Sequence, residues 1–67
     1  MQGEWYEIEF WSEGDGCWFR LPPQTHRHLL KRASFLTKRK LKKAAKGILA
    51  PHRFVHVTPR GRVVVDG

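Results

Sequence analysis

Residues 5–21 carry the clearest structural signal in the chain, and they read WYEIEFWSEGDGCWFRL. From Trp5 to Ser12 apolar and charged residues alternate with a period of two, the pattern of a β-strand with one buried face. The turn-forming run EGDG at 13–16 follows, and residues 17–21 then return as a second short strand. This stretch therefore predicts a β-hairpin.

The register of the hairpin follows from the position of its turn. If Gly14 and Asp15 form the tip, residues whose numbers add to 29 lie opposite one another. The expected pairs are Ile8 with Leu21, Phe10 with Phe19, Glu9 with Arg20, and Trp11 with Trp18. One face is then apolar and suited to a core, whereas the other is amphipathic. The amphipathic face carries Trp5, Trp11, Trp18 and Arg20.

A basic amphipathic helix is predicted from about residue 26 to residue 46. Two prolines at 22–23 end the second strand, Thr25 is a suitable N-cap, and Gly47 is a suitable C-cap. Such a helix would be about 31 Å long, which is long against short strands, so a break near Ser34–Thr37 that gives two helices is an open alternative. Phe35 lies in the middle of the basic face, and a break there would turn it inward.

The end of the chain predicts a second hairpin. Residues 53–57 (RFVHV) and 62–65 (RVVV) are rich in β-formers, and the intervening TPRG has Pro and Gly at favourable turn positions. The order is therefore hairpin, helix, hairpin. We expect an α+β fold in which a small antiparallel sheet of three or four strands is covered on one face by the helix, with residues 1–67 forming a single domain.

Length and composition limit the possible classes of protein. With 67 residues and 7.9 kDa the chain can bury only one modest core. Its one cysteine, Cys17, forms no internal disulfide, and no metal-ligand spacing occurs, so neither a metal nor another cofactor is expected. The sequence shows neither a membrane span nor a signal peptide, which makes the cytoplasm the expected location.

The distribution of charge is the strongest functional signal. Residues 1–24 hold five acidic residues and one basic residue, whereas residues 25–67 hold twelve basic residues and one acidic residue. These net charges of −4 and +11 sum to the overall +7. A basic segment without acidic partners repels itself, and an anion such as nucleic-acid phosphate relieves that repulsion.

We therefore expect a small nucleic-acid-binding protein whose contacts go mainly to phosphates. DNA is slightly favoured over RNA, because a basic helix fits the major groove and the sheet lacks the aromatic motif of common RNA-binding sheets. The expected contacts come from the helix and from the tip of the second hairpin. They are Lys31, Arg32, Lys38, Arg39, Lys42, Lys43, Lys46, Arg60 and Arg62.

Two other functions remain open at this point. The amphipathic face of the first hairpin, with Trp5, Trp11, Trp18 and Arg20, would suit a small adaptor or inhibitor that docks on a larger enzyme, or a homodimer. A less favoured alternative is a small ribonuclease-type toxin that uses histidine as acid and base. The histidines are His26, His28, His52 and His56. No catalytic residue is expected, and the chain is not expected to be an enzyme.

Overall fold

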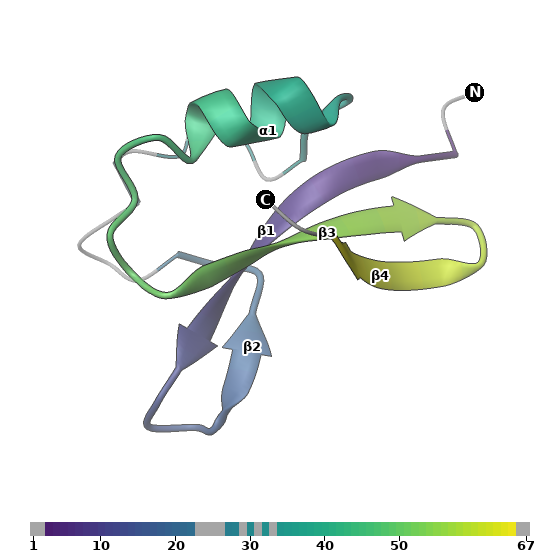
Figure 1. The fold of residues 1–67 in the computed structure, drawn as a ribbon. Coiled ribbons are helices and arrows are strands. Elements are labelled where there is room, and N and C mark those ends of the chain that lie inside the picture. Colours follow the sequence, from purple (N-terminus) through teal and green to yellow (C-terminus); the bar gives the residue numbers. More distant parts are fainter. Residues whose placement is uncertain (1–2, 23–26, 29, 31, 33, 66–67) are drawn as a thin grey trace.

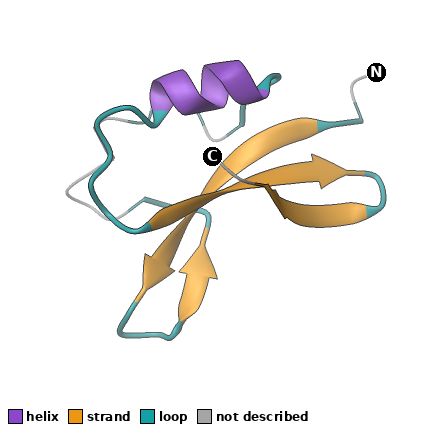
Figure 2. Cartoon of the chain, in the orientation of Figure 1, coloured by secondary structure: helices purple, strands orange, loops and turns teal. Residues whose placement is uncertain are grey.

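A computed structural model describes residues 3–22, 27–28, 30, 32 and 34–65 of this chain. The elements are β1 (Trp5–Ser12), β2 (Cys17–Phe19), α1 (Lys38–Ala44), β3 (His52–Thr58) and β4 (Gly61–Val65). The strands form one curled antiparallel sheet in the order β2-β1-β3-β4 (Figures 1 and 2). The described residues confirm the α+β class and the four-stranded antiparallel sheet.

Strand β1 is the centre of the sheet. Residues 5–10 pair with β3 on one side, and residues 10–12 pair with β2 on the other. Beyond the end of β2, the second side of β1 is continued by Phe35 from the connection before α1. Its backbone forms a two-way bridge with Tyr6, with N···O distances of 2.7 and 2.8 Å.

The predicted register of the first hairpin is confirmed where β2 exists. Phe10 lies opposite Phe19 and Trp11 opposite Trp18, and the ladder closes one pair later at the turn. Gly16 has a φ of 65°, a left-handed conformation that glycine adopts without strain. Because β2 ends at Phe19, the two pairs predicted beyond it, Ile8 with Leu21 and Glu9 with Arg20, are not part of the ladder.

The observed helix α1 is much shorter than the continuous helix predicted for residues 26–46. α1 has seven residues and begins after Thr37, whose hydroxyl accepts the Lys40 N–H at 3.2 Å. The predicted break near Ser34–Thr37 agrees with the described residues and a continuous helix is wrong, but of the two helices that the break would give only the second, α1, occurs in the described ranges. A continuous helix would leave Phe35 on its basic face, whereas the break buries that ring to 7% exposure. No helix in the described ranges is long and apolar enough to cross a membrane.

The two ends of the predicted helix have different outcomes. The predicted start at His26 and the cap at Thr25 lie outside the described residues. Arg27 and His28 form a short 3₁₀ turn. At the other end Ala45, with a φ of −81°, occupies the cap position, so the predicted C-cap at Gly47 is wrong.

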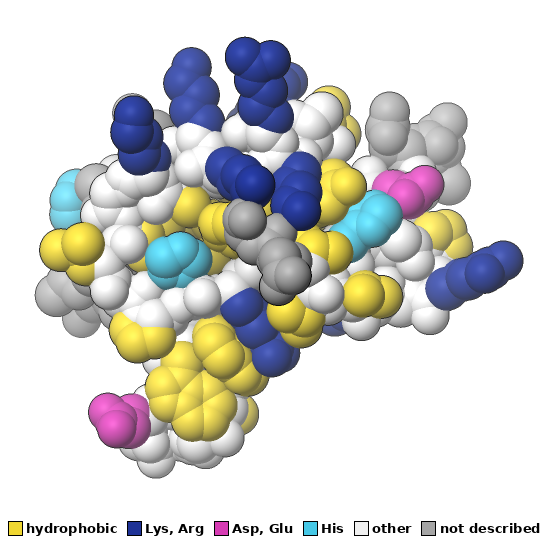
Figure 3. All heavy atoms as spheres, viewed as in Figure 1, with side chains coloured by type: hydrophobic (Ala, Val, Ile, Leu, Met, Phe, Trp, Pro, Cys, Tyr) yellow, Lys and Arg dark blue, Asp and Glu magenta, His cyan; other side chains and the backbone are white. Residues whose placement is uncertain are grey.

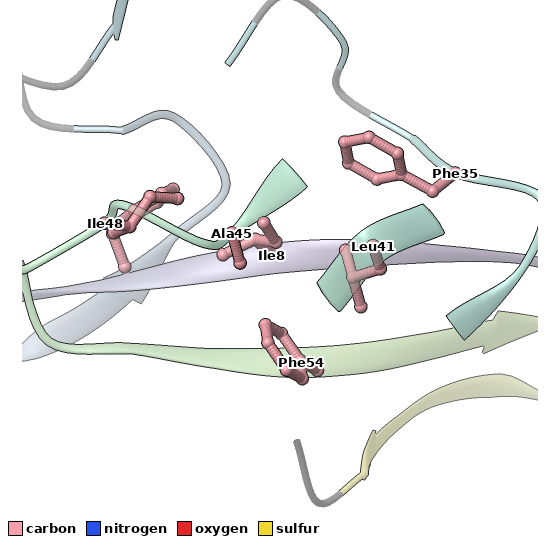
Figure 4. Packing of buried hydrophobic residues seen from close by; sticks show 7 residues of the cluster. Ile8, Phe35, Leu41, Ala45, Ile48 and Phe54 are labelled. Carbon is pink, nitrogen blue, oxygen red and sulfur yellow. The ribbon is translucent and has the colours of Figure 1, made fainter. Parts of the chain in front are cut away.

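The core lies between the sheet and the segment from residue 35 to residue 48 (Figure 4). Its sheet side consists of Ile8, Phe10 and Phe54. The opposite side consists of Phe35, Leu41, Ala45 and Ile48. Leu41 is fully buried and is the only buried residue within α1 itself. The chain on either side of α1 therefore supplies much of this layer, and the expectation that the helix covers one face is not confirmed.

Candidate functional site

The sheet face opposite Leu41 holds a compact network of ion pairs. Glu7 and Glu9 of β1 point to this face, and Arg62 from β4 reaches both carboxylates, with N···O distances of 2.7 and 2.8 Å. Arg53 from β3 lies 2.7 Å from Glu9, and Arg20, just after β2, lies 3.0 Å from Glu7. The network thus links β1, β3 and β4 with the residue that follows β2.

The two glutamates of this network are buried but charged. Glu7 is 2% exposed and Glu9 is 8% exposed. Burial by itself raises the pKa of both carboxyl groups, but hydrogen bonds outweigh it and leave each pKa below its usual value. Glu7 accepts bonds from the Trp5 indole at 2.6 Å and from Arg62, whose own pKa is raised in return. Three arginines therefore share two buried carboxylates, which leaves the network with one net positive charge.

This placement corrects one sequence interpretation and bears on a second. Arg20 pairs with Glu7 rather than with Glu9. Arg62, predicted to bind phosphate, is already held by two carboxylates. Arg53 was not singled out from the sequence at all, since its position opposite Glu9 depends on the pairing of β1 with β3.

The cations of α1 are arranged differently. Residues 38–46 contain six Lys or Arg side chains and no acidic residue. At 100° per residue, Arg39, Lys42 and Lys43 fall within an arc of roughly 100° on the side away from Leu41, and Lys46 follows in the turn after the helix. These four residues, here called the cationic face, are Arg39, Lys42, Lys43 and Lys46, and all are exposed. Lys and Arg side chains gather over α1 in Figure 3.

No acidic group among the described residues neutralises the cationic face and its neighbours. Within the part of the chain that the structure describes, no carboxylate forms an ion pair with a cation of α1. Lys38 and Lys40 flank the face, and Lys40 was not among the residues predicted from the sequence. A count of all basic residues in the segment 38–46 would have included Lys40.

The charges of α1 also oppose its own folding. Lys38 precedes Lys42, and Arg39 precedes Lys43, by four residues, so like charges are neighbours on the helix surface. The first turn contains no acidic residue to offset the positive end of the helix dipole. An anion placed against this face would relieve both effects.

The remaining predicted cations lie elsewhere. Arg60 is exposed in the turn between β3 and β4, where its N–H donates to the Thr58 hydroxyl at 3.1 Å. Arg32 is exposed in the connection before α1. Lys31 lies outside the described residues.

The tryptophans of the first hairpin form a pair rather than a row of three. Trp11 and Trp18 have ring centroids 5.3 Å apart, and the Arg53 guanidinium lies 4.3 Å from the centroid of Trp18. Trp5 shares their face, but six residues separate it from Trp11, roughly 20 Å along an extended strand. The predicted surface is therefore divided by the ion-pair network, which also holds Arg20.

A concavity of about 770 Å³ lies beside the tryptophan pair. Its lining includes Trp11, Trp18, Phe19 and Leu21. Phe19 and Leu21 are 44% and 70% exposed. Its charged lining residues are Asp15, Arg20 and Arg27, so it concentrates less positive charge than the cationic face and is a poorer place for phosphate.

The described histidines do not converge on one point. His52 points its Nδ1 at the Ala50 carbonyl, 2.7 Å away, and His56 stacks on Tyr6 with centroids 4.5 Å apart. The two residues share a face of β3 but are four positions apart, roughly 13 Å. His26 lies outside the described residues. Among the residues that are described, no group of three or more metal-ligating side chains occurs.

The chain matches no protein family model, no curated protein and no solved structure. A function for it therefore has to rest on the placement of its own residues.

Proposed function

We propose that this protein binds nucleic acid through the cationic face of α1, with duplex DNA preferred over RNA. The observation that supports the proposal is that two groups of cations differ in whether they have carboxylate partners. Arg20, Arg53 and Arg62 are all paired with Glu7 or Glu9, whereas the cationic face has no carboxylate partner in the described structure. The two buried carboxylates, Glu7 and Glu9, pair with arginines of the sheet, and the helix keeps its charge for an external anion.

The contacts would be made mainly to phosphates. The seven residues of α1 span about 10 Å, so the cationic face can meet phosphates along only a short stretch of backbone. Lys side chains bind phosphate as flexible point charges and do not read bases, so this binding depends little on sequence. Arg60 provides an auxiliary contact at the far turn, while Arg62 serves the fold.

Duplex DNA is preferred because of where the charges and the aromatic rings lie. A helix carrying cations on its outer side suits the major groove of B-DNA, about 12 Å wide. The tryptophan pair, of which Trp11 is exposed and Trp18 half-buried, lies in the hairpin that also carries Glu13 and Asp15. These carboxylates disfavour the phosphates of a single strand stacked there. We expect the protein to act in the cytoplasm.

A pair of charge variants tests the proposal. Lys42→Gln with Lys43→Gln lowers the net charge by two and removes half of the cationic face. Fluorescence anisotropy with a labelled DNA duplex at 50 mM salt should show a loss of affinity of at least tenfold, because each lost phosphate contact also loses its counterion release.

The matched control lowers the net charge equally at a distance from α1. Gly14→Glu with Leu21→Glu adds two negative charges in the first hairpin, at a glycine with open space around it and at a leucine that is 70% exposed. Its affinity should stay within about threefold of the wild type. Equal losses in the two variants would mean that only net charge matters, and the proposal would be wrong.

A second candidate function is an adaptor or inhibitor that docks through the first hairpin. It is favoured by the exposed Trp11, Phe19 and Leu21 beside the concavity described above. Aromatic side chains at a concave surface are typical anchors of protein interfaces. Trp11→Ala with Trp18→Ala separates the two functions, because this variant should keep its affinity for DNA and lose any protein partner.

A further inference from the structure

We propose that this protein forms a symmetric dimer in which β4 pairs antiparallel with β4 of a second copy. β4 is an edge strand of the described sheet, and it ends in three consecutive valines. Val63 and Val64 are 58% and 52% exposed, on opposite faces of the strand. An exposed strand edge with apolar side chains invites pairing with another strand unless something blocks it.

The backbone direction at this edge follows from the hydrogen bonds inside the sheet. The Trp11 N–H donates to the Pro51 carbonyl on the β3 side, whereas the Tyr6 N–H donates to Phe35 on the opposite side. Odd-numbered residues of β1 therefore face β3. The same alternation continues through the observed pairs of β1 with β3 and of β3 with β4. It follows that the backbone N–H and C=O groups of Arg62 and Val64 point outward, away from β3.

Only one register uses the whole edge. β4 runs from Gly61 to Val65, so antiparallel pairing with a copy of itself overlaps all five residues only when Val63 lies opposite Val63 of the second copy. Arg62 then lies opposite Val64 of the second copy, and these are the residues whose backbone groups face outward. The two Val63 side chains meet at the symmetry axis as a close pair without hydrogen bonds, about 4.5 Å apart at Cα.

The chemistry of the edge fits a second copy of this chain. Strand edges are commonly guarded by a charged side chain, and Arg62 is the only charged residue of β4. Its guanidinium is turned onto the sheet face by Glu7 and Glu9, so it does not guard the edge. At the opposite edge β2 has only three residues, which makes it a poorer template.

The positive charge of α1 does not prevent this pairing. α1 contacts β1, which lies two strands in from the β4 edge. The β1 strands of the two copies would lie five strand spacings apart, roughly 24 Å. Because the Debye length is about 8 Å at physiological salt, repulsion between the two helices is largely screened.

The dimer has a consequence that rests on the proposed function. A two-fold axis perpendicular to the sheet keeps the same face of both copies on the same side. Both cationic faces would then point to one side of an eight-stranded sheet and could engage one nucleic-acid molecule together. The second contact would be intramolecular and would strengthen binding without new chemistry.

Sedimentation equilibrium of the full chain without nucleic acid tests the dimer independently of the proposed function. The expected mass is twice the monomer mass of 7.9 kDa. Val63→Lys places two ammonium groups against each other at the axis and should return the mass to that of the monomer. Leu49→Lys, at a residue that is 91% exposed, is the matched control and should leave the dimer intact.

Disulfide trapping tests the register. In a Cys17→Ser background, Val63→Cys should cross-link two chains under mild oxidation, because its Cα separation lies in the range that disulfides span. Val64→Cys should not, because the two introduced thiols would sit at diagonal positions about 7–8 Å apart. A monomeric mass for the wild type at millimolar concentration, a dimer insensitive to Val63→Lys, or cross-linking through Val64→Cys alone would each overturn the proposal.

Discussion

Removal of the Arg62 guanidinium should destabilise the whole sheet, because this one group holds two buried carboxylates. Arg62→Met keeps most of the aliphatic side chain and deletes the charge. Glu7 and Glu9 would then lose the partner that they share, at N···O distances of 2.7 and 2.8 Å.

The expected size of the effect follows from the burial of the network. Breaking a fully buried ion pair costs about 3–5 kcal/mol, since the remaining charge is left without a partner. The Arg62 side chain is 36% exposed, and each glutamate keeps another arginine, Arg20 or Arg53. We therefore expect a loss of about 2 kcal/mol in the free energy of unfolding, which corresponds to roughly 8–16 °C in Tm for a domain of this size.

The pH dependence gives this prediction a second signature. The folded pKa values of Glu7 and Glu9 lie below their ordinary value of 4.5. The stability that they contribute is therefore complete above the ordinary pKa and is lost as the pH falls through the folded pKa. The difference between wild type and Arg62→Met should be largest at pH 7 and should shrink as the pH is lowered below about 4.5.

Urea unfolding followed by tryptophan fluorescence measures both the loss in free energy of unfolding and its dependence on pH. Arg60→Met is the control, because Arg60 is exposed in the turn and forms no ion pair within the described structure; its effect should stay within about 0.5 kcal/mol. Equal stability of the two variants at pH 7, or a difference that does not change with pH, would refute the reasoning.

Three further substitutions test the packing, the helix start and the first turn. Leu41→Ala should cost about 2–5 kcal/mol in thermal unfolding, because Leu41 is fully buried, whereas Leu49→Ala should change stability by less than about 0.5 kcal/mol; equal effects would contradict the core described here. Thr37→Ala should cost about 1 kcal/mol and reduce helical circular dichroism, since its hydroxyl caps α1, and Thr37→Ser should restore both. Gly16→Ala should cost about 1–2 kcal/mol because of the positive φ at that position, and an unchanged Tm would mean that the turn has a different conformation.

The first hairpin was predictable because its information is local. A four-residue turn fixes the register of the two strands beside it, so Phe10 and Trp11 meet the partners expected from the sequence. The pairing of β1 with β3 brings together residues more than forty positions apart, such as Glu9 and Arg53. Nothing in the local pattern specifies that pairing, so the network of carboxylates and arginines could not be foreseen.

The extent of the helix depended on a competition that the sequence pattern does not resolve. Helical periodicity continues through Phe35, but a continuous helix would expose this ring among cations. Burial of Phe35 against Tyr6 and the core stabilises a break, and repulsion between the lysines weakens the helix that would have to resist it. The cationic face survives in the short helix, because its side chains are close together in sequence.

The dependence of DNA affinity on salt is the most direct test of the claim that the cationic face of α1 meets a polyanion. Four phosphate contacts, one for each side chain of this face, predict a slope of log affinity against log salt of about −3.6, and a dimer using both faces predicts a steeper one. Between 50 and 200 mM salt the affinity for a DNA duplex should therefore fall at least 100-fold. A slope flatter than about −1, or no measurable binding at 50 mM salt, would contradict the account.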